Sequence, residues 1–424
     1  MNENDLDPSG REIRDRLMSR DGFSPDLPTA AGGQRSSLGL RLFLYVIRGL
    51  QVGSLDIHLP GGERRTLTGT QPGPHGVLQI NNSRIFGHVL RNGEVGFGEA
   101  YLDHCWDSPD LSSLLSVLYL NEPYYRLYEK NILSRFWGWI QHRRRANHKD
   151  GSKANIEYHY DLGNLFYKMW LDDTMAYSSA VFSKPSETLK EAQLNKFRLM
   201  YDRLDLKPEH HLLEIGSGWG GFAIYAAERS GCRVTSVTLS REQLDEARRR
   251  AAAAGLADRI SFELLDYRDI TGRYDRVVSI EMYEAVGEEY WPSYFAAISK
   301  ALKPGGRAAI QGITINSAIF EQYRTKRDFI QKYIFPGGML CPPGRFQDLA
   351  AQHALVPEDP RFYAKDYADT LAHWHRNVIA SRHEIVKQFD ERFLRLWRYY
   401  LGYCECGFRT GSIDLMQITL RKSS

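Results

Sequence analysis

The chain has 424 residues, of which 42% are hydrophobic, 12% aromatic and 25% charged. These values are typical of a folded globular protein and exclude a wholly disordered or fibrous chain. Fifty-five Lys and Arg residues against 52 Asp and Glu residues leave a net charge of only +3. That balance excludes a strongly polybasic nucleic-acid binder. A chain of 424 residues predicts two or three globular domains. The charge balance predicts that the protein has no nucleic-acid partner.

The apolar segments and the cysteines predict a cytoplasmic location. The most apolar stretch, Leu38–Leu50, is interrupted by Arg41 and Arg48, and it is shorter than the roughly 20 residues of a membrane-spanning helix. The polar start of the chain lacks the pattern of a signal peptide. Five irregularly spaced cysteines are typical of free thiols in a reducing compartment, and Cys404 and Cys406 are too close together for a zinc pair.

The first 150 residues change composition twice. Residues 1–37 are rich in Asp, Arg, Ser, Pro and Gly, which predicts a disordered segment. Residues 38–120 read as a small α+β domain, because short runs of alternating polarity are separated by turn residues. Its expected strands are Gly53–Leu59, Arg64–Thr68, Val77–Ile80 and Val95–Ala100, with a helix at Asp110–Tyr119.

Residues 121–153 form an amphipathic and basic linker. Trp137 and Trp139 lie in an aromatic stretch, and Arg143–Arg145 follow it directly. Tryptophan rings favour the headgroup boundary of a bilayer, and each nearby Lys or Arg contributes roughly 1 kcal/mol on an anionic surface. A helix packed on the next domain and followed by a solvated linker explains the same pattern, so both interpretations stay open here.

Residues 154–424 alternate between strand and helix patterns, which predicts βαβ units and a parallel sheet with helices on both faces. Residues 314–410 are expected to form a largely helical, aromatic-rich cap, and Ser412–Leu420 a final edge strand. The predicted strands before the cap are His211–Ile215, Arg233–Leu239, Ile260–Leu265, Arg276–Ile280 and Arg307–Ile313.

A glycine-rich loop follows the first of these strands. Glu214 ends the strand, and Gly216, Gly218 and Gly220 permit a tight turn and a close approach of the backbone to a ligand before the next helix. The loop lacks the Walker lysine and serine, so phosphoryl transfer is disfavoured. NAD binding is the serious rival, because its loop is also rich in glycine.

Polar residues end the other predicted strands, on the edge where such sheets bind ligands. Asp266 could instead begin a turn, and Gln243 could form a structural capping box with Ser240. The whole series resembles class I S-adenosylmethionine-dependent methyltransferases more than NAD enzymes. The predicted cofactor residues on these strand ends, beyond the glycine loop, are Thr238, Leu239, Gln243, Asp266, Tyr267 and Arg268.

Further motifs resemble the cyclopropane fatty acid synthase family, in the right order along the whole catalytic domain. The resemblance implies a class I, Rossmann-like methyltransferase sheet, S-adenosylmethionine as cofactor and unsaturated acyl chains of membrane phospholipids as substrate. It also implies that Tyr177 and Ser178 close over the methionine end of the cofactor. The matching segments are Tyr158–Asn164, Tyr177–Ala180, Leu213–Gly221, Asp266–Asp269, Glu281–Gly287, Lys332–Gly338 and Asp366–Leu371.

The family resemblance also implies a base. Bicarbonate serves this role in the family, held near a Cys, a Glu, a His, an Ile and a Tyr. Glu284, Ile313 and Tyr367 match these positions, whereas Ser179 replaces the Cys and Gln311 replaces the His. We expect Glu284, Tyr367 and Gln311 to surround a small anion pocket, with Ser179 and Ile313 offering backbone groups. The two replacements leave both the base and the product open.

Three functions remain open at this point. The first is methylation of a cis double bond of a phospholipid to give a cyclopropane. The second is the same transfer giving a methyl-branched or methylated polyunsaturated product, as in furan fatty acid synthesis. The third is an inactive lipid-binding module. For the enzymes, the resemblance implies peripheral attachment to the inner face of the membrane. The oligomeric state stays open, with a homodimer among the alternatives.

Overall fold

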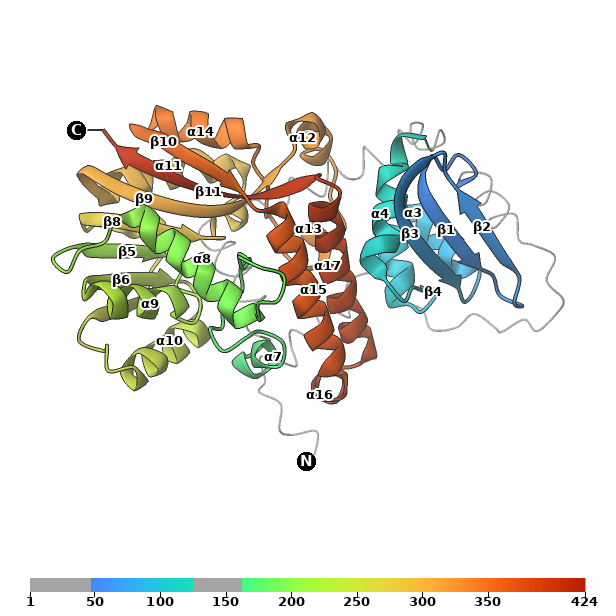
Figure 1. Cartoon of the computed structure of the whole chain (residues 1–424), viewed down its shortest axis with the longest axis horizontal. Coiled ribbons are helices and arrows are strands. Elements are labelled where there is room, and N and C mark those ends of the chain that lie inside the picture. The colour runs from blue at the N-terminus through green and yellow to red at the C-terminus, as the bar shows by residue number, and fades with distance from the viewer. Residues whose placement is uncertain (1–46, 125–161, 424) are drawn as a thin grey trace.

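The computed structural model describes residues 47–124 and 162–423. They form two sheets that share no strand, a smaller one near the start of the chain and a larger one in the remainder (Figure 1). The smaller sheet has the order β2-β1-β3-β4. Its domain consists of β1 (Val52–His58), β2 (Arg64–Thr68), β3 (Gln71–Ile80), α3 (Arg84–Leu102), β4 (Trp106–Asp107), α4 (Leu111–Leu120) and the short turn η1 (Glu122–Tyr124).

The smaller sheet forms where alternating polarity predicted it. Leu55 and Ile57 of β1 are fully buried while their neighbours are half-buried, so one face of the strand lies on the core. A tight turn at Pro60–Gly62 joins β1 to its antiparallel partner β2, and β3 pairs parallel to β1. The first three predicted strands and the helix at Asp110–Tyr119 are confirmed.

The predicted strand at Val95–Ala100 is wrong, because these residues belong to α3. Phe97 and Tyr101 are both buried, one helical turn apart. An ideal Cβ on Gly98 would lie 2.6 Å from the Phe329 ring, so this glycine lets the helix approach its aromatic neighbour closely. The alternation of glycine with apolar residues therefore reflects tight helix packing and not a strand.

The larger sheet has the order β10-β11-β9-β8-β5-β6-β7. Neighbouring strands from β9 to β7 are parallel, whereas β11 runs antiparallel to both β9 and β10. The predicted βαβ alternation is confirmed. The strands are β5 (His211–Ile215), β6 (Arg233–Thr238), β7 (Ile260–Leu264), β8 (Tyr274–Ile280), β9 (Leu302–Ile315), β10 (Leu355–Phe362) and β11 (Ile413–Lys422).

Helices cover both faces of the larger sheet and create two separate cores. Successive strand residues point to opposite faces, so Leu212 packs in one core and Leu213 in the other. The core with Leu212 includes α8, α9 and α10, and the core with Leu213 includes α11 and α14. These helices are α8 (Leu189–Leu204), α9 (Gly221–Ser230), α10 (Arg241–Ala253), α11 (Trp291–Ala301) and α14 (Pro343–Gln352).

The last strand is not at the edge of the sheet, as the sequence analysis predicted. β11 forms at the expected place, but β10 pairs with its outer side and becomes the edge strand. Residues 314–410 were expected to be largely helical, so β10 was not predicted. Its two prolines, Pro357 and Pro360, are unusual in a strand and hide the strand pattern in the sequence. Proline lacks a backbone N–H, and an edge strand has a free side on which this is tolerated.

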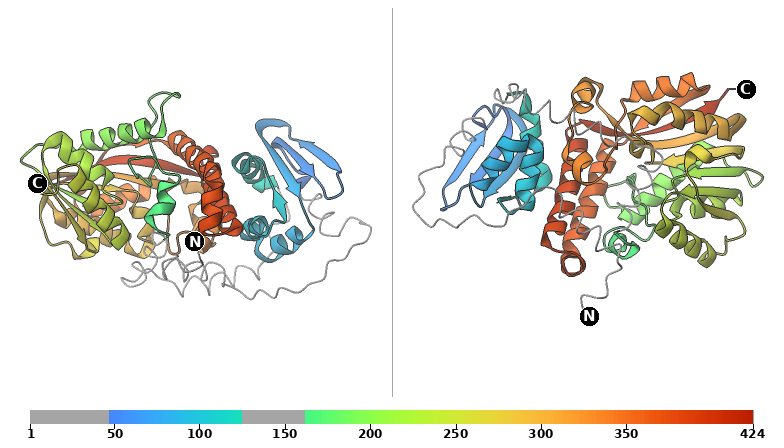
Figure 2. Two further views of the ribbon diagram at one scale, coloured as in Figure 1. Left: turned by 90° about the horizontal axis from the view of Figure 1, so that it is seen from below. Right: turned by 180° about the vertical axis from the view of Figure 1, so that it is seen from behind.

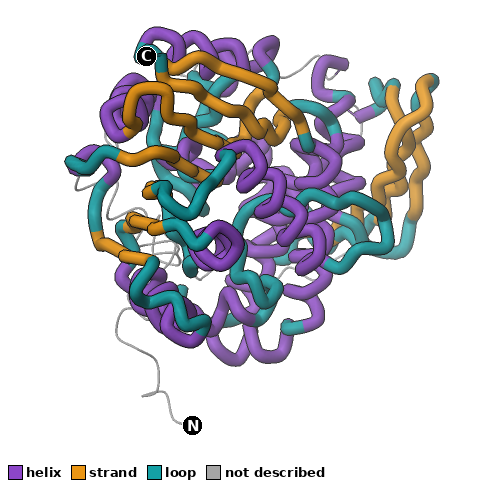
Figure 3. The backbone as a smooth tube through the Cα atoms, turned by 60° about the vertical axis from the view of Figure 1, so that its left-hand side comes forward, coloured by secondary structure: helices purple, strands orange, loops and turns teal. Residues whose placement is uncertain are grey.

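Three cap helices stand between the two sheets (Figures 2 and 3). They are α15 (Ala364–Ala380), α16 (Arg382–Gln388) and α17 (Glu391–Arg409). α17 packs against α15 on one side and against α3 and α4 on the other. The guanidinium of Arg395 donates to the carbonyls of Tyr101 and Trp106 and pairs with Asp107 at 2.7 Å. One continuous hydrophobic core joins the small domain to the cap.

The remaining described elements are α7 (Asn164–Lys168), α12 (Ser317–Tyr323), α13 (Phe329–Tyr333), η3 (Tyr267–Asp269), η4 (Tyr283–Ala285) and η5 (Glu288–Tyr290). The predicted domain limits near residues 37 and 153 lie outside the described residues, as do Trp137, Trp139 and Arg143–Arg145. Within residues 47–124 and 162–423, no helix is long and apolar enough to cross a bilayer. The same residues contain no His, Cys, Asp and Glu cluster that could hold a metal ion.

Candidate active site

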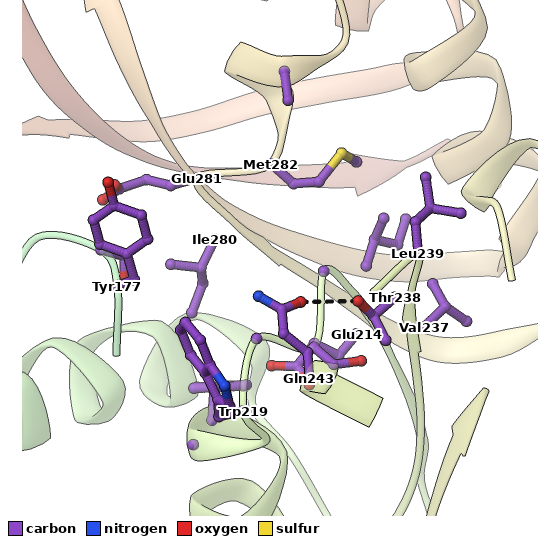
Figure 4. Close-up of a pocket in the computed structure, with 18 of the residues that line it drawn as sticks. Tyr177, Glu214, Trp219, Val237, Thr238, Leu239, Gln243, Ile280, Glu281 and Met282 are labelled. Carbon is purple, nitrogen blue, oxygen red and sulfur yellow. Dashed lines mark hydrogen bonds between the residues drawn. The ribbon is translucent and has the colours of Figure 1, made fainter. Parts of the chain in front are cut away.

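A pocket opens at the carboxyl ends of β5, β6, β7 and β8 (Figure 4). The chain leaves β5 for β6 and β7 and then returns to β8 on the other side of β5, so the strand order reverses between β5 and β8. Ligands of open α/β sheets bind at such a switch point. All but one of the predicted cofactor residues line the pocket, namely Tyr177, Ser178, Glu214, Gly216, Gly218, Thr238, Leu239, Gln243, Asp266, Tyr267 and Arg268.

The loop after β5 brings the backbone to the pocket wall. Gly216 has a φ of +96° and Gly218 a φ of +49°, both in the left-handed region that glycine adopts without strain. The N–H groups of Gly216 and Ser217 both donate to the carbonyl of Val237, at 3.0 Å, and tie the loop to β6. A Cβ on Gly216 would lie 3.3 Å from the Cβ of Met282, so the pocket is narrow here.

Gly220, at the end of this loop, packs against the next helix. It is the one predicted cofactor residue that does not line the pocket. A Cβ on Gly220 would lie 3.0 Å from the Phe262 ring and 3.1 Å from the Cβ of Ala247. Trp219 lies in the pocket wall, and its indole N–H donates to Asn164 at 2.5 Å. Gly220 therefore has a packing role, while Trp219 closes the pocket floor.

The end of β6 contributes a hydroxyl and an amide. Thr238 donates to Oε1 of Gln243 at 2.9 Å, and this pair is drawn in Figure 4. Ser240 caps α10 by accepting from the backbone N–H of Gln243 at 3.2 Å, but its own N–H donates to Thr238. Only half of the predicted capping box forms, because the Gln243 side chain turns into the pocket.

The end of β7 places an ion pair in the pocket wall. Asp266 accepts from the Arg268 side chain at 2.6 Å and from the Arg268 backbone N–H at 2.9 Å. The guanidinium also lies 5.6 Å from the ring centroids of Tyr267 and Tyr290. Asp266 thus begins a turn, as the structural interpretation predicted, and also lines the pocket together with Tyr267.

The segment before α8 forms the opposite wall. Ser178 accepts a hydrogen bond from Nζ of Lys196 at 2.6 Å, and its carbonyl accepts from the Gln193 amide at 2.7 Å. The hydroxyls of Tyr177 and Tyr400 lie 2.6 Å apart. Side chains of α8 and α17 therefore fix this segment over the pocket.

Charged groups inside the pocket have shifted pKa values. Burial lowers the pKa of Lys196 to about 8, although Glu281, Asp172 and Glu214 oppose the shift. Burial raises the pKa of Glu214 to about 8, against a 2.5 Å hydrogen bond from Ser236 and the charge of Lys196. A cationic ligand would stabilise the charged form of Glu214, so the pocket suits a positively charged guest.

Glu281 receives the donors that the sequence analysis expected near Glu284. Oε1 of Glu281 accepts from the Ser179 backbone N–H and from the Gln311 amide, each at 2.8 Å. Oε2 accepts from the Tyr367 hydroxyl at 2.5 Å. Glu281 follows β8, is partly buried and lines the pocket (Figure 4). Three of the predicted catalytic residues therefore meet at a carboxylate that had been given no role.

Glu284 lies one short turn further along, in η4. Its Oε1 accepts from the Ile313 backbone N–H, the group that was expected to face a bound anion. Burial raises the pKa of Glu284 to about 8, and the charge of Glu281 adds to this shift. Glu284 is therefore held by the backbone of β9, apart from the donors that converge on Glu281.

The pocket lining also includes Lys196, Phe197 and Met282, which were not predicted from the sequence. The sequence pattern could have identified Lys196, because this lysine interrupts the apolar stripe formed by Ala192 and Met200 on the same face of α8. A lysine on a buried face needs a special partner or function. The role of Glu281 had no comparable signal, because its partners come from three separate segments.

The pocket fits S-adenosylmethionine. Its apolar walls suit a flat base, its hydroxyl and amide at Thr238 and Gln243 suit a ribose, and the carboxyl of Glu214 suits a cationic group. The glycine loop lets a ligand approach the backbone. Together with the strand order, these features define a class I S-adenosylmethionine-dependent methyltransferase.

The chain belongs to the mycolic acid cyclopropane synthetase family, whose model matches residues 147–418. It is 41% identical to the tuberculostearic acid methyltransferase UfaA1 of Mycobacterium tuberculosis over 346 residues, 78% of this chain and 80% of that protein. It is 34% identical to the cyclopropane-fatty-acyl-phospholipid synthase of Escherichia coli K12, over 81% of this chain and 87% of that protein. The predicted family and enzyme class are confirmed.

A solved structure agrees with this assignment. The mycolic acid cyclopropane synthase CmaA1, complexed with SAH and CTAB, superimposes with a TM-score of 0.61 at 29% identity. The match covers 64% of this chain and 98% of CmaA1. The predicted methyltransferase fold and its cofactor are thus confirmed.

Proposed function

We propose that the enzyme methylates a cis double bond in a phospholipid acyl chain and closes a cyclopropane ring. The observation that carries this proposal is the junction between the cofactor pocket and the aromatic cap. Glu281 lines the pocket and accepts a hydrogen bond from Tyr367 of α15, so a proton acceptor lies between the cofactor and the cap. Methylation of an alkene needs such an acceptor beside aromatic walls.

The aromatic walls match the charge that develops. An alkene is a weak nucleophile, and its methylation leaves a carbocation on the acyl chain. Aromatic faces attract a cation by about 0.5–2 kcal/mol each. The ring centroids of Trp170, Tyr177 and Trp374 lie 5.3–5.5 Å from one another, and both tryptophans are fully buried. Tyr177 lines the pocket with the two tryptophans packed behind it, so its ring is the aromatic face that would attract the cation.

Binding of the cofactor follows from the strand ends. S-adenosylmethionine supplies an electrophilic methyl group when bound. Thr238 and Gln243 are the proposed ribose partners, and Asp266 and Tyr267 border the adenine. Glu214 balances the positive charge of the ligand. The proposed cofactor set is Tyr177, Ser178, Glu214, Gly216, Gly218, Thr238, Leu239, Gln243, Asp266, Tyr267 and Arg268.

A second product is favoured by one specific observation. The relative that shares 41% identity is named a tuberculostearic acid methyltransferase and not a cyclopropane synthase. Removal of a proton from a neighbouring chain carbon, in place of the new methyl, would give a methyl-branched alkene. Both products add one CH2 to the lipid, but only the branch keeps a double bond.

The test uses the full-length enzyme with vesicles of dioleoyl phospholipid, and with fully saturated vesicles as the control. We expect a gain of one CH2 on the unsaturated lipid alone, measured by mass spectrometry. Mild hydrogenation of the product then separates a cyclopropane from a methyl-branched alkene. Saturable S-adenosylmethionine binding without any lipid conversion would contradict the proposal and favour an inactive lipid-binding module.

The proposed substrate implies work at a membrane surface, with peripheral attachment to the inner face of the membrane. The basic and aromatic segment with Trp137, Trp139 and Arg143–Arg145 is the proposed contact. Electrostatic docking weakens as salt screens the charges. Co-sedimentation with anionic vesicles should therefore fall with added salt and when the three arginines are replaced by glutamine. Binding that ignores both changes would contradict this contact.

A further inference from the structure

We propose that Glu281 is the general base of the reaction and replaces the bicarbonate ion that the family resemblance implies. The inference rests on the proposed function and adds the identity of the proton acceptor. The observation behind it is that hydrogen-bond donors from three separate segments converge on the Glu281 carboxylate at the pocket wall.

The donors around Glu281 form a complete anion site. The Ser179 N–H and the Gln311 amide hold Oε1, and the Tyr367 hydroxyl holds Oε2. Ser179 and Gln311 are fully buried. The Gln311 carbonyl accepts from the Gln417 amide at 2.8 Å, which turns the Gln311 N–H groups toward Glu281. These are the donors expected to hold bicarbonate, and they hold a carboxylate of the chain itself.

A second anion does not fit beside this carboxylate. The Ser179 N–H and the Tyr367 hydroxyl each donate to Glu281, so a bicarbonate ion would have to displace it from them. The ion would also lie next to the negative charge of Glu281 in a poorly solvated site, where like charges strongly disfavour each other. Lys196 supplies one positive charge nearby, which favours a single ionised carboxylate.

The backbone at Glu281 supports a functional role. Its φ of +51° lies in the left-handed region, which strains a residue that carries a side chain. Strained residues of this kind persist when the surrounding structure holds them in place, and they cluster at active sites. Glycine would adopt the same conformation without strain, and the strained glutamate is held in place by its three donors.

The step balances without another reactant. The alkene π electrons form a bond to the methyl carbon while the carbon–sulfur bond of the donor breaks and leaves its electron pair on sulfur. Glu281 then removes a proton from that methyl carbon, and the C–H electron pair closes the ring. The carboxylate becomes a carboxylic acid, which afterwards returns the proton to water.

The strain at this position suggests the variant that tests the proposal. Glu281→Gly relieves the positive φ and empties the anion site, and Glu281→Gln keeps the side-chain volume but removes the base. A positioned base typically contributes 10²–10⁴-fold in rate. The matched control is Glu94→Gln, because Glu94 also accepts from a tyrosine, Tyr403 at 2.7 Å, but lies outside the pocket lining.

The first measurement is lipid methylation in CO2-free buffer under argon, with and without added bicarbonate. The wild-type enzyme and Glu94→Gln should keep full activity without bicarbonate. Glu281→Gln should lose at least 10²-fold and stay inactive. Glu281→Gly should lose as much, and bicarbonate or formate should restore its activity in a concentration-dependent way.

The second measurement is calorimetric titration of bicarbonate into each protein in the absence of lipid. We expect saturable binding to Glu281→Gly and none to the wild-type enzyme. Bicarbonate dependence of the wild-type enzyme, or near-full activity of Glu281→Gln, would overturn the inference while leaving the proposed function intact. Absence of any wild-type activity on unsaturated lipid would instead overturn the proposed function. Circular dichroism and cofactor binding exclude misfolding of the variants.

Discussion

The two ends of the pocket are formed by different kinds of chemical group. At the end formed by β5, β6 and β7, backbone groups and side chains from consecutive strand-end loops shape the wall, and Gly216 lies close to Met282. At the end formed by β8, side chains from separate segments, including Tyr367 of the cap, converge on Glu281. We therefore expect backbone shape to govern binding at the first end and charge placement to govern the proposed chemistry at the second.

This difference predicts how each end responds to mutation. The binding end should be sensitive to changes that alter the backbone and should lose cofactor affinity. The reactive end should be sensitive to the loss of single polar atoms and should lose turnover while cofactor affinity remains. Four substitutions test this division, in order of decreasing expected effect.

The largest effect is expected from Gly216→Val. A valine at a φ of +96° is strained, and its side chain would enter the narrow gap beside Met282. We expect the affinity for S-adenosylmethionine to fall at least 100-fold by calorimetry. The control is Gly255→Val, because Gly255 also has a positive φ, of +71°, but nothing lies within 4 Å of its added Cβ. Equal binding losses in the two variants would show that backbone strain alone is responsible.

Tyr367→Phe should have the next largest effect. It removes the hydroxyl that donates to Glu281 and keeps the ring, whose centroid lies 4.3 Å from that of Phe408. A hydrogen bond to a charged group contributes about 1.5–3 kcal/mol, so turnover should fall about 10- to 100-fold. Cofactor affinity should not change, and Tyr403→Phe should keep full turnover.

The same substitution should also change the pH profile. The Tyr367 hydroxyl lowers the pKa of Glu281, against the larger effect of burial, which raises it. Loss of the hydroxyl therefore raises this pKa further, and the acidic limb of the turnover profile should move to higher pH. An unchanged profile would show that Tyr367 only packs the cap and does not position the base.

The binding end was the part of the site that the sequence could predict. Its motifs are local, because a strand and the loop that follows it are adjacent in the chain, and parallel strands bring their carboxyl ends to one edge. The Glu281 cluster depends on contacts from Ser179, Gln311 and Tyr367, which lie 102, 30 and 86 positions away from Glu281 in the sequence. The edge strand β10 and helix α3 were misjudged for a related reason, since packing partners and not local pattern decide them.

The third substitution, Lys196→Met, removes the positive charge that α8 contributes to the pocket. Its pKa is lowered from 10.5 to about 8 by burial. The unfolded chain therefore binds more protons between about pH 8 and pH 10.5, and the free energy of unfolding should rise with pH in that window. The shift corresponds to about 3 kcal/mol at most, at 1.36 kcal/mol per pKa unit.

We expect Lys196→Met to lose this rise, measured by urea unfolding at several pH values between 7 and 10.5. Lys190→Met is the matched control, because Lys190 lies on the same helix but is exposed and pairs with Asp173 at 2.8 Å. The control should keep the rise of the wild-type protein. A constant difference between the wild-type protein and Lys196→Met across this range would contradict the lowered pKa of Lys196.

The smallest effect is expected from Ser179→Cys, the exception at the reactive end. Ser179 contacts Glu281 through its backbone N–H at 2.8 Å, while its hydroxyl donates to the Ala180 carbonyl at 2.8 Å. A cysteine keeps the N–H, so turnover should change by no more than about 2-fold, in line with substitutions worth about 0.5 kcal/mol. Ser179→Pro removes the N–H itself and should reduce turnover about as much as Tyr367→Phe. Steady-state kinetics on both variants, after cofactor binding has confirmed their fold, checks this contrast. A 10-fold loss in Ser179→Cys would show that the hydroxyl takes part in the reaction, and the anion site would then need a fourth donor.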